Sequence, residues 1–567
     1  MLLALLACGV PTAPPTPVVH PAPIDDAGRD AIYLAMVDRL RDGESSNHPT
    51  EPDNLQGWHG GDLKGVLMEL DRLQALGIQQ IWLTPITQSR QEPFHEWGAY
   101  HGYWPSDWRE VEPRFGDWSD VEALREGLDA RGMSLVLDMV YNHTEFDHPL
   151  RESHPHWFHS ERPIVDWQDP EEVLTGQVHG LPDLKQSEPE VAEYLTEATL
   201  LWLEKTGASA IRVDAVRHID PSFIRELKAA VSERYPHPVT WIGEIFEGDP
   251  VQLAETWTAS DMEQVFDFPL HYALLDTVCG EADTARLAGI LALDRLYSDP
   301  NNLVTFLDNH DLPRLASRCS EAGQSEEAIR LLIGLRGRNS WTWGTETGAQ
   351  GTHEPENRAS LSLEATNGPS ADFLGEAVRF RAAHPVLRQG LSTLIYLDGD
   401  TAVWLRTLTH SAALVSYSKS ARSDLQLPLW IHKLRPKASL GQALLESHSL
   451  QLQQGSAVIV LEDSEDALKA FEAESKRRKD PTLHTVTLSS ETEGFVLGAG
   501  PELGNWQLDK ALAIPPEGLR LSLPEGAVMR FKTLTQEGET LQWESGPNRT
   551  HWVTADPGSH SLLLTAQ

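Results

Sequence analysis

The sequence predicts an α/β fold centred on a (β/α)8 TIM barrel, with smaller all-β units after it. Strand-like and helix-like runs alternate from residue 31 onward, which is the pattern of repeated βα units. Several of these runs are apolar and end abruptly in polar residues, as buried parallel strands do at their carboxyl tips. The eight strand-like runs are Ile32–Val37, Gln80–Ile86, Ser134–Val140, Ser209–Ala215, Thr240–Phe246, Gln264–Pro269, Val304–Asp308 and Ser340–Gly344.

The segments between the strands carry helix signals. Residues 62–77 repeat their apolar positions at helical spacing, with Asp62 placed to cap the helix and Gly77 to end it. Residues 190–205 follow the same pattern. From 143 to 189 the chain is polar, rich in His, Pro and Trp, and without a helical period. We therefore expect a short insert between the third barrel strand and its helix.

The chain should contain several domains, because 567 residues are too many for one hydrophobic core. After the barrel, short apolar runs separated by turns favour antiparallel sheets. The expected parts are 1–8, a signal segment of the lipoprotein type; 9–27, a tether rich in Pro and Thr; 28–385, the barrel with its insert at about 143–189; 386–463, a β-sheet domain; 464–480, a charged linker, helical or flexible; and 481–567, a last unit.

The composition limits the partners. The chain has 84 acidic and 46 basic residues, a net charge of −38, which argues against nucleic acid and anionic membranes as binding partners. A neutral polymer is unaffected by such a field. The 18 tryptophans are many. Most should lie in hydrophobic cores, but exposed aromatic faces are surfaces on which sugar rings stack.

The three cysteines raise two questions. Cys8 ends the run Leu5-Leu-Ala-Cys8, which resembles the cleavage box of bacterial lipoproteins, although the apolar stretch is short and lacks a basic start. We expect an exported protein, extracellular or at the cell surface, attached to a membrane only if Cys8 carries a lipid. A fortuitous apolar N-terminus is the alternative. Cys279 and Cys319 either form a disulfide or remain buried thiols, and the sequence leaves both open.

Four segments at predicted strand ends carry most of the chemistry. They are Leu137–His143, Ala210–His218, Trp241–Phe246 and Phe306–Asp311. Carboxylates at the carboxyl tips of barrel strands are typical of catalytic groups. In order and wording the four segments resemble the α-amylase family, glycoside hydrolase family 13, over residues 32–358. The resemblance implies retaining cleavage of α-1,4-glucosidic bonds in starch-like glucans by a barrel with a B-domain insert and an all-β C domain.

The resemblance implies three catalytic roles: Asp214 as nucleophile, Glu244 as general acid/base and Asp311 as transition-state stabiliser. The residues themselves support the first two. Arg212 lies two residues before Asp214 on the same side of the strand, where a cation favours the ionised carboxylate. Glu244 follows the apolar Trp241-Ile-Gly, a setting that raises the pKa of a carboxyl group and suits a general acid.

Two further sets of residues follow from the resemblance. The substrate-binding set is Tyr103, His143, Arg212, Arg217, Phe246, His310 and Arg358. The set for a structural calcium ion is the side chains of Asn142 and Asp183 with the main-chain carbonyl of His218, and oxygen donors suit this ion. Two positions depart from the family pattern: Glu354 replaces the usual Asp of a donor-side loop, and Lys185 replaces a common Asn.

The last unit has its own signature. The segments Gly500–Trp506, Met529–Lys532 and Trp543–Arg549 resemble, in this order, the starch-binding module of carbohydrate-binding family 20. The resemblance implies a β-sandwich on which Trp506 and Trp543 form a platform for glucose rings, with Asn548 donating or accepting hydrogen bonds to sugar hydroxyls. Two core tryptophans of an ordinary sandwich are the alternative. Residues 507–525 lack tyrosines, so a second sugar site is not expected.

Together these features predict an α-amylase that acts on starch and maltooligosaccharides as a monomer. A maltooligosaccharide-forming exo-amylase has the same domain order and stays open. A cyclodextrin glucanotransferase is the other enzymatic alternative, because Ala99–Trp104 resembles that group, but the insert is short and 464–480 leaves no room for an extra domain. A non-catalytic glucan-binding protein is the alternative from another class, and such proteins usually lack a catalytic carboxylate.

Overall fold

The computed structural model describes residues 30–46, 50–428, 430–431, 434–446, 449–490, 494–537, 540–556 and 560–564. The expected signal segment with Cys8 and the expected tether lie outside the described residues.

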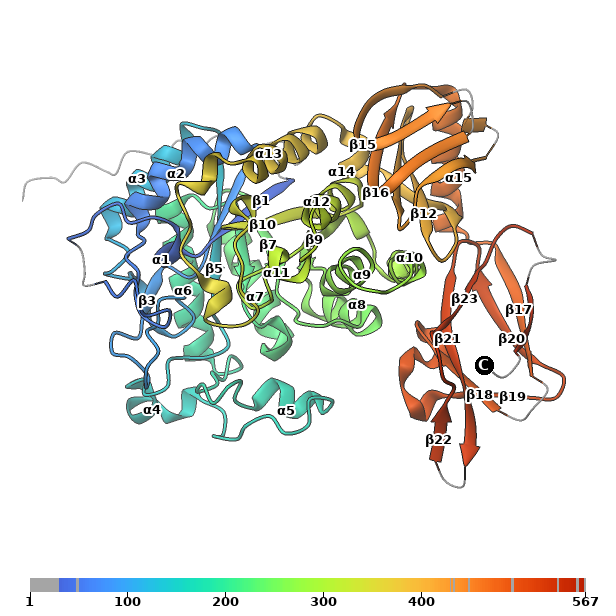
Figure 1. The fold of residues 1–567 in the computed structure, drawn as a ribbon. Coiled ribbons are helices and arrows are strands. Elements are labelled where there is room, and N and C mark those ends of the chain that lie inside the picture. Colours follow the sequence, from blue (N-terminus) through green and yellow to red (C-terminus); the bar gives the residue numbers. More distant parts are fainter. Residues whose placement is uncertain are drawn as a thin grey trace, which may run out of the picture.

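The fold class predicted from the sequence is confirmed. Eight parallel strands close into a barrel in the order β1-β10-β9-β8-β7-β6-β5-β2, and each contains part of one predicted strand. Helices surround the barrel, as Figure 1 shows. The strands are β1 (Ala31–Ala35), β2 (Gln80–Leu83), β5 (Ser134–Met139), β6 (Ala210–Val213), β7 (Thr240–Gly243), β8 (Gln264–Phe266), β9 (Leu303–Phe306) and β10 (Arg338–Thr342).

The two helices predicted from their sequence signals are observed. Helix α2 (Leu63–Leu76) follows Asp62, whose carboxylate accepts the N–H of Gly65 at 2.6 Å, and it ends at Gly77 in the left-handed region. Helix α6 (Pro189–Thr206) is the second. The others around the barrel are α1 (Val37–Leu40), α3 (Trp118–Asp129), α7 (Pro221–Arg234), α8 (Pro250–Ser260), α9 (Phe268–Val278), α10 (Thr284–Ala292), α11 (Leu315–Arg318), α12 (Gln324–Gly334), α13 (Pro369–Ala382) and α14 (Pro385–Gln389).

The insert leaves the barrel after β5 and returns at α6. It contains two short helices, α4 (Leu150–Ser153) and α5 (Pro170–Thr175), although its sequence shows no helical period. Helices of 4 and 6 residues are too short to produce such a period. A bridge between His143 and Asp183 joins the two ends of the insert. A hairpin of β3 (Thr87–Ser89) and β4 (Pro105–Val111), absent from the predicted elements, follows β2.

An antiparallel sheet follows the barrel, as the pattern of short apolar runs predicts. It consists of β11 (Leu391–Leu397), β12 (Thr401–Leu408), β13 (Ser411–Ser418), β14 (Arg422–Gln426), β15 (Pro436–Glu446) and β16 (Ser449–Leu461). Of the two alternatives for 464–480, the helix is observed: α15 (Glu465–Lys479) is capped by the Ser464 hydroxyl. Ala467 and Ala470 of this helix pack against the core of the sheet. The helix is therefore part of this C domain rather than a free spacer.

The last unit is a β-sandwich with its own core. One sheet contains β17 (Leu483–Ser490), β20 (Leu519–Pro524) and β24 (Ser561–Leu564). The other contains β18 (Gly494–Gly498), β19 (Leu512–Ile514), β21 (Val528–Glu537), β22 (Thr540–Trp543) and β23 (Arg549–Trp552). A 3-10 segment, η10 (Pro501–Trp506), follows β18.

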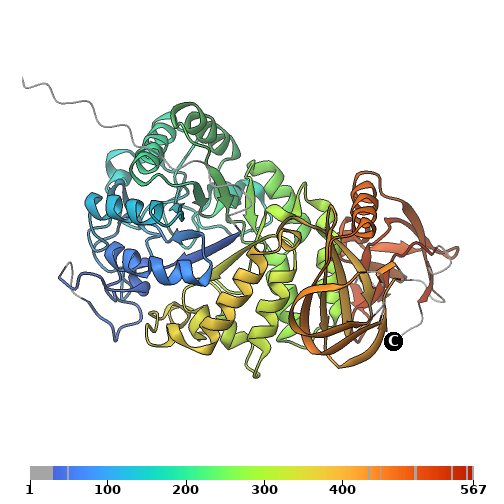
Figure 2. The ribbon, with the colours of Figure 1, turned by 90° about the horizontal axis from the view of Figure 1, so that it is seen from above.

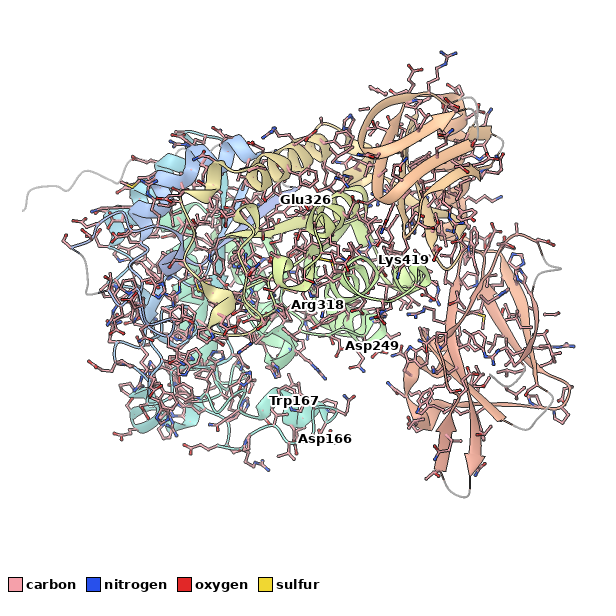
Figure 3. The ribbon with its side chains drawn as sticks, in the orientation of Figure 1. Asp166, Trp167, Asp249, Arg318, Glu326 and Lys419 are labelled. Carbon is pink, nitrogen blue, oxygen red and sulfur yellow. A yellow bond between two sulfur atoms is a disulfide. The ribbon has the colours of Figure 1, made fainter. Side chains whose placement is uncertain are left out.

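Side chains connect the last unit directly to the barrel. The Asn505 amide donates to Asp249 Oδ2 at 2.6 Å, and Arg295 pairs with Glu502 at 2.8 Å. Asp249 lies on the side of the barrel that faces the last unit (Figure 3). Seen from above, the C domain and the last unit lie at the same end of the molecule (Figure 2). None of the helices in the described part of the chain is both long and apolar enough to cross a lipid bilayer.

Of the two alternatives for Cys279 and Cys319, the disulfide is observed. Their Cα atoms are 4.8 Å apart. Cys279 ends α9 and Cys319 ends α11, which follows the loop of Asp311. The bond therefore connects a barrel helix to the segment behind one of the proposed catalytic loops.

Replacing both cysteines by alanine should lower the free energy of unfolding by about 3–4 kcal/mol, because a cross-link between residues 40 apart restricts the unfolded chain. Urea unfolding followed by tryptophan fluorescence measures the change. A reductant should lower the stability of the natural protein toward that of the variant and leave the variant unchanged. A natural protein that is insensitive to reductant would contradict the prediction.

Candidate active site

The buried guanidinium of Arg212 is the centre of the site. Arg212 lies on β6 and is 1% exposed. Its Nη1 donates to Asp138 Oδ1 at 2.8 Å and to Asp214 Oδ1 at 2.7 Å, and its Nη2 lies 2.8 Å from Glu244 Oε2. The three carboxylates come from β5, β6 and β7 or the residue just after them, and these strands are neighbours in the barrel. One cation therefore contacts both a candidate nucleophile and a candidate acid.

Asp138 is a residue of this cluster that the sequence analysis did not single out. It pairs directly with Arg212 in the register of β5 and β6. Its second oxygen accepts hydrogen bonds from the Tyr103 hydroxyl at 2.7 Å and from Trp82 Nε1 at 2.9 Å. The sequence shows an acid inside an apolar strand at this position. Such an acid indicates a polar cluster, because a fully buried carboxylate needs partners of this kind. Asp138 contacts Arg212 from within β5, whereas Asp214 and Glu244 follow the ends of their strands.

The backbone also contacts the candidate acid. Ala215 follows Asp214 and has a φ of 49°, in the left-handed region that is costly for residues other than glycine. Its N–H donates to Glu244 Oε2 at 3.1 Å. Strain of this kind gathers at functional sites, where the surrounding structure holds it. Here the strained residue connects the segment of Asp214 to the carboxylate of Glu244.

The pKa values of Glu244 and Asp214 are both raised. Burial raises the pKa of Glu244 to about 7 and that of Asp214 to about 6, although the cation of Arg212 opposes both shifts. The expected direction for Glu244 agrees with this. We expected Arg212 to favour the ionised form of Asp214, and it does attract this carboxylate. Burial nevertheless raises the pKa of Asp214, because the charge of Arg212 is shared among three carboxylates.

Asp311 lies on the other side of the site, after β9. It contacts His310 Nε2 at 3.1 Å and Arg358 Nη2 at 2.9 Å. Loss of surrounding water would raise the pKa of Asp311, but the neighbouring His310 and Arg358 lower this pKa below its ordinary value. Glu354 pairs with the same arginine. The Tyr103 ring stacks parallel to His310 at 5.1 Å, which brings this side into contact with the Arg212 cluster.

The two site histidines are buried and neutral. Burial lowers the pKa of His143 to about 4 and that of His310 to about 3. The Nε2 atom of His143 lies 3.0 Å from the Tyr103 carbonyl oxygen. Both imidazoles are therefore uncharged hydrogen-bonding groups at neutral pH, a form suited to sugar hydroxyls.

Arg217 and Phe246 lie at a more exposed edge. Phe246 is 50% exposed and packs against Phe268 at 4.5 Å. Arg217 donates to the Trp167 carbonyl at 2.8 Å and lies 3.6 Å from the carboxylate of Glu247. The sequence analysis did not single out Trp167, which is 44% exposed on the insert and is labelled in Figure 3. The guanidinium of Arg217 thus connects the segments that carry two exposed aromatic rings.

The residues of the implied calcium site lie at the junction of barrel and insert. Asn142 Oδ1 and Asp183 Oδ1 are buried without a hydrogen-bond partner, so both fit a hard cation. The other oxygen of Asp183 contacts His159 at 2.6 Å. The His218 ring contacts the Val173 carbonyl oxygen, so His218 would bind the ion only through its main-chain carbonyl, as the resemblance implies. Among the described residues no three His, Cys, Asp or Glu side chains gather as a metal site. A cation would therefore need amide and main-chain oxygens.

The two tryptophans of the last unit come together. Their ring centroids are 6.2 Å apart with planes at 40°; Trp543 is 43% exposed and Trp506 is half-buried. Two tryptophans of a hydrophobic core, the alternative from the sequence, would be less exposed than this. Asn548 lies five residues after Trp543. Lys532, to which the sequence analysis gave no role, donates to the carbonyls of Glu544 and Gly546, and so supports the turn between Trp543 and Asn548.

Comparison with known proteins identifies relatives of both parts. A model described as the alpha-amylase catalytic domain matches residues 32–373, and one described as a starch binding domain matches 482–561. Cyclomaltodextrin glucanotransferase of Klebsiella oxytoca is 25% identical over 616 residues, covering 92% of this chain and 92% of that protein.

Two solved structures are similar to the first part of the chain. An alpha-amylase from Geobacillus thermoleovorans, complexed with acarbose, is 28% identical with a TM-score of 0.69, and an Anoxybacillus alpha-amylase is 27% identical with a TM-score of 0.70. Each alignment covers 77% of this chain and 99% of the other. Because the catalytic-domain model spans more than half of the sequence, the chain belongs to the alpha-amylase family.

Proposed function

We propose that the protein is an α-amylase-type hydrolase that cleaves α-1,4-glucosidic bonds of starch and related glucans with retention of configuration. The observation that carries this proposal is the contact of Asp214 and Glu244 with one buried guanidinium, with the pKa of Glu244 the higher of the two. A retaining glycosidase needs one carboxylate that attacks and a second that is protonated, roughly 5–5.5 Å apart.

The reaction proceeds in two displacements. Glu244 donates its proton to the glycosidic oxygen while the Asp214 carboxylate attacks the anomeric carbon, so the glycosidic bond breaks and a glycosyl ester forms. Glu244 then takes a proton from water, which attacks the same carbon and releases Asp214. Asp311, ionised beside Arg358 and His310, binds sugar hydroxyls and stabilises the distorted ring.

This arrangement argues against a non-catalytic glucan-binding protein. Asp214, Glu244 and Asp311 are all present, and each contacts a basic side chain. A protein that only binds glucan has no need for a carboxyl group whose pKa is raised to about 7.

Glu244→Gln should lower kcat on amylose by about 10²–10⁴-fold and leave substrate binding almost unchanged, because it removes the proton donor and keeps the side-chain shape.

In the natural enzyme, kcat/KM should fall as pH rises through about 7, where Glu244 loses its proton, and as pH falls through about 6, where Asp214 gains one. Reducing-sugar assays across pH and calorimetric binding measure both effects.

Glu255→Gln is the matched control, since Glu255 is an exposed carboxylate on α8 outside the site. It should keep normal turnover and the same pH profile. Near-normal turnover of amylose by Glu244→Gln would remove the assignment of this residue as acid and base.

A second candidate function is transfer of the glycosyl group to a sugar. Trp167 and Phe246 favour it, because two exposed aromatic faces joined through Arg217 can hold an acceptor sugar in place of water. The likeness to a glucanotransferase over 92% of both chains supports the same candidate. Linear products from soluble starch indicate hydrolysis, and cyclic or elongated products indicate transfer. Product length distinguishes endo from exo action in the same experiment.

Calcium is the proposed structural ion at Asn142, Asp183 and the His218 carbonyl. Positive charge there would hold the insert against the barrel. A chelator should lower the melting temperature, and added calcium should restore it by mass action. Asp183→Asn should weaken this response. An unchanged melting curve, with no metal found by elemental analysis of the purified protein, would exclude the ion.

Trp506 and Trp543 are the proposed starch platform, which would keep the enzyme at an insoluble surface and raise the local concentration of substrate. Replacing both by alanine should abolish adsorption to raw starch and slow hydrolysis of granules, while the rate on short maltooligosaccharides stays normal. Leu563→Ala, at a 60% exposed residue of the same unit, is the control and should keep adsorption. Adsorption that survives the double substitution would place the platform elsewhere.

We also propose that the protein is exported. The apolar run before Cys8 supports this, and so does the disulfide, since such bonds persist in oxidising compartments. Starch granules outside the cell would be accessible to such an enzyme. Labelling with a radioactive fatty acid tests whether Cys8 carries a lipid.

A further inference from the structure

Arg406 is a buried cation far along the chain from the catalytic residues. It lies on β12 of the C domain, beside α14, and is 0% exposed. Its Nη2 donates to the Leu387 carbonyl at 3.1 Å and to Asn301 Oδ1 at 3.5 Å. Its Nε and Nη1 are buried and have no hydrogen-bond partner. These contacts place an incompletely paired guanidinium between the C domain and the barrel.

The carboxylate that attracts Arg406 is already paired with another arginine. Asp294, which attracts Arg406, shares the single N–H of Arg336 Nε between its two oxygens, each 2.9 Å away. Arg381, which repels Arg406, has its own partner in Asp30 at 2.7 Å. No ion pair to Arg406 occurs in the described part of the chain. Burial lowers the pKa of Arg406 well below its ordinary value, and the repulsion of Arg381 and Arg478 adds to this effect.

A second unpaired donor lies beside the first. Ser392 on β11 is the direct cross-strand partner of Arg406, so their side chains lie on the same face of the sheet as neighbours. The Ser392 hydroxyl is buried without a hydrogen-bond partner. The Nη2 of Arg478 donates to the Ser392 carbonyl at 3.0 Å, which brings another positive charge to this position.

An open space reaches Ser392, the neighbour of Arg406. A cavity of about 500 Å³ lies where the barrel, the C domain and the last unit meet. The residues lining it from the three parts include Asp294, Ser392, Trp404, Arg478, Glu525 and Trp552. Ser392 lines this cavity, whereas Arg406 has no exposed surface. A ligand that contacts both must be small enough to pass from the cavity to the buried guanidinium.

We propose that a small inorganic monovalent anion, of which chloride is the example, binds between Arg406 Nε and Nη1 and the Ser392 hydroxyl. A guanidinium stays protonated in proteins, so burial leaves its charge to be balanced rather than removed. Water would satisfy the N–H groups but would leave the charge unbalanced. An anion does both, and charge-assisted hydrogen bonds are the stronger kind.

The site would stabilise the contact between two domains. Arg406 belongs to the C domain, while Asn301, its other side-chain partner, belongs to the barrel segment before β9. An anion at Arg406 would strengthen this contact without touching the substrate. The expected effect is therefore on stability and not on the chemistry of cleavage.

The melting temperature in sodium chloride, with sodium gluconate added to keep the ionic strength constant, tests the proposal. Gluconate is too large to reach Arg406. The melting temperature should rise with chloride concentration as expected for ligand binding to the folded state. Ser392→Ala should weaken the rise and Arg406→Met should abolish it. Arg422→Met, which removes a C-domain arginine that pairs with Asp398, should leave the rise unchanged.

A natural protein that melts at the same temperature in both salts would overturn the proposal, and so would an equal chloride response in Arg406→Met. If Arg406→Met does not fold, crystals of the natural protein soaked in bromide decide. An anomalous peak between Arg406 and Ser392 supports the anion site. Ordinary water density without an anomalous signal at that position overturns it.

Discussion

The buried guanidinium of Arg212 is the interaction on which the catalytic arrangement depends. Three carboxylates from neighbouring strands contact it, and the register places Asp138 and Ile242 directly opposite Arg212 on either side. A cation without water is costly unless excellent partners surround it. Asp138 has further donors in Tyr103 and Trp82, and Glu244 has one in the Ala215 N–H, but Arg212 is the cation that all three carboxylates share. Loss of Arg212 would leave the buried carboxyl groups without their shared cation, and it is the register of β5, β6 and β7 that brings them to it.

Sharing one cation among three acids also explains the protonation states. A single Arg–Asp pair would lower the pKa of the acid, as reasoning from neighbouring residues suggests. In the barrel the attraction of Arg212 is divided among Asp138, Asp214 and Glu244, and burial acts on each of them in full. Asp311 differs because it has two cationic or polar partners of its own, Arg358 and His310. Carboxyl groups of the same type thus differ in pKa, because some share one cation and another has partners of its own.

Features that depend on neighbouring residues could be predicted from the sequence, and features that depend on distant partners could not. Strands, the cap at Asp62 and the acids at the strand tips are local features, and each leaves a pattern of period or position within a few residues. Asp138 and Trp167 matter through contacts with distant segments. Asp138 meets a residue 74 positions later, and Trp167 is connected to Arg217, 50 positions later. The local sequence shows an acid inside an apolar strand at Asp138, but it does not identify the distant partner of either residue. The choice between a disulfide and free thiols at Cys279 was open for the same reason.

The carboxylate of Asp249 has two roles, one of which connects the last unit to the barrel. Oδ1 of Asp249 accepts the N–H groups of Val251 and Gln252 and so begins helix α8, while Oδ2 accepts the amide of Asn505. Asn505 directly precedes Trp506, and Asp249 lies five residues after Glu244. This hydrogen bond therefore connects the segment of Trp506 to the loop that carries the candidate acid, in addition to its connection through the C domain. Direct contacts of this kind favour one placement of the tryptophan pair relative to the barrel, which a flexible linker would not do.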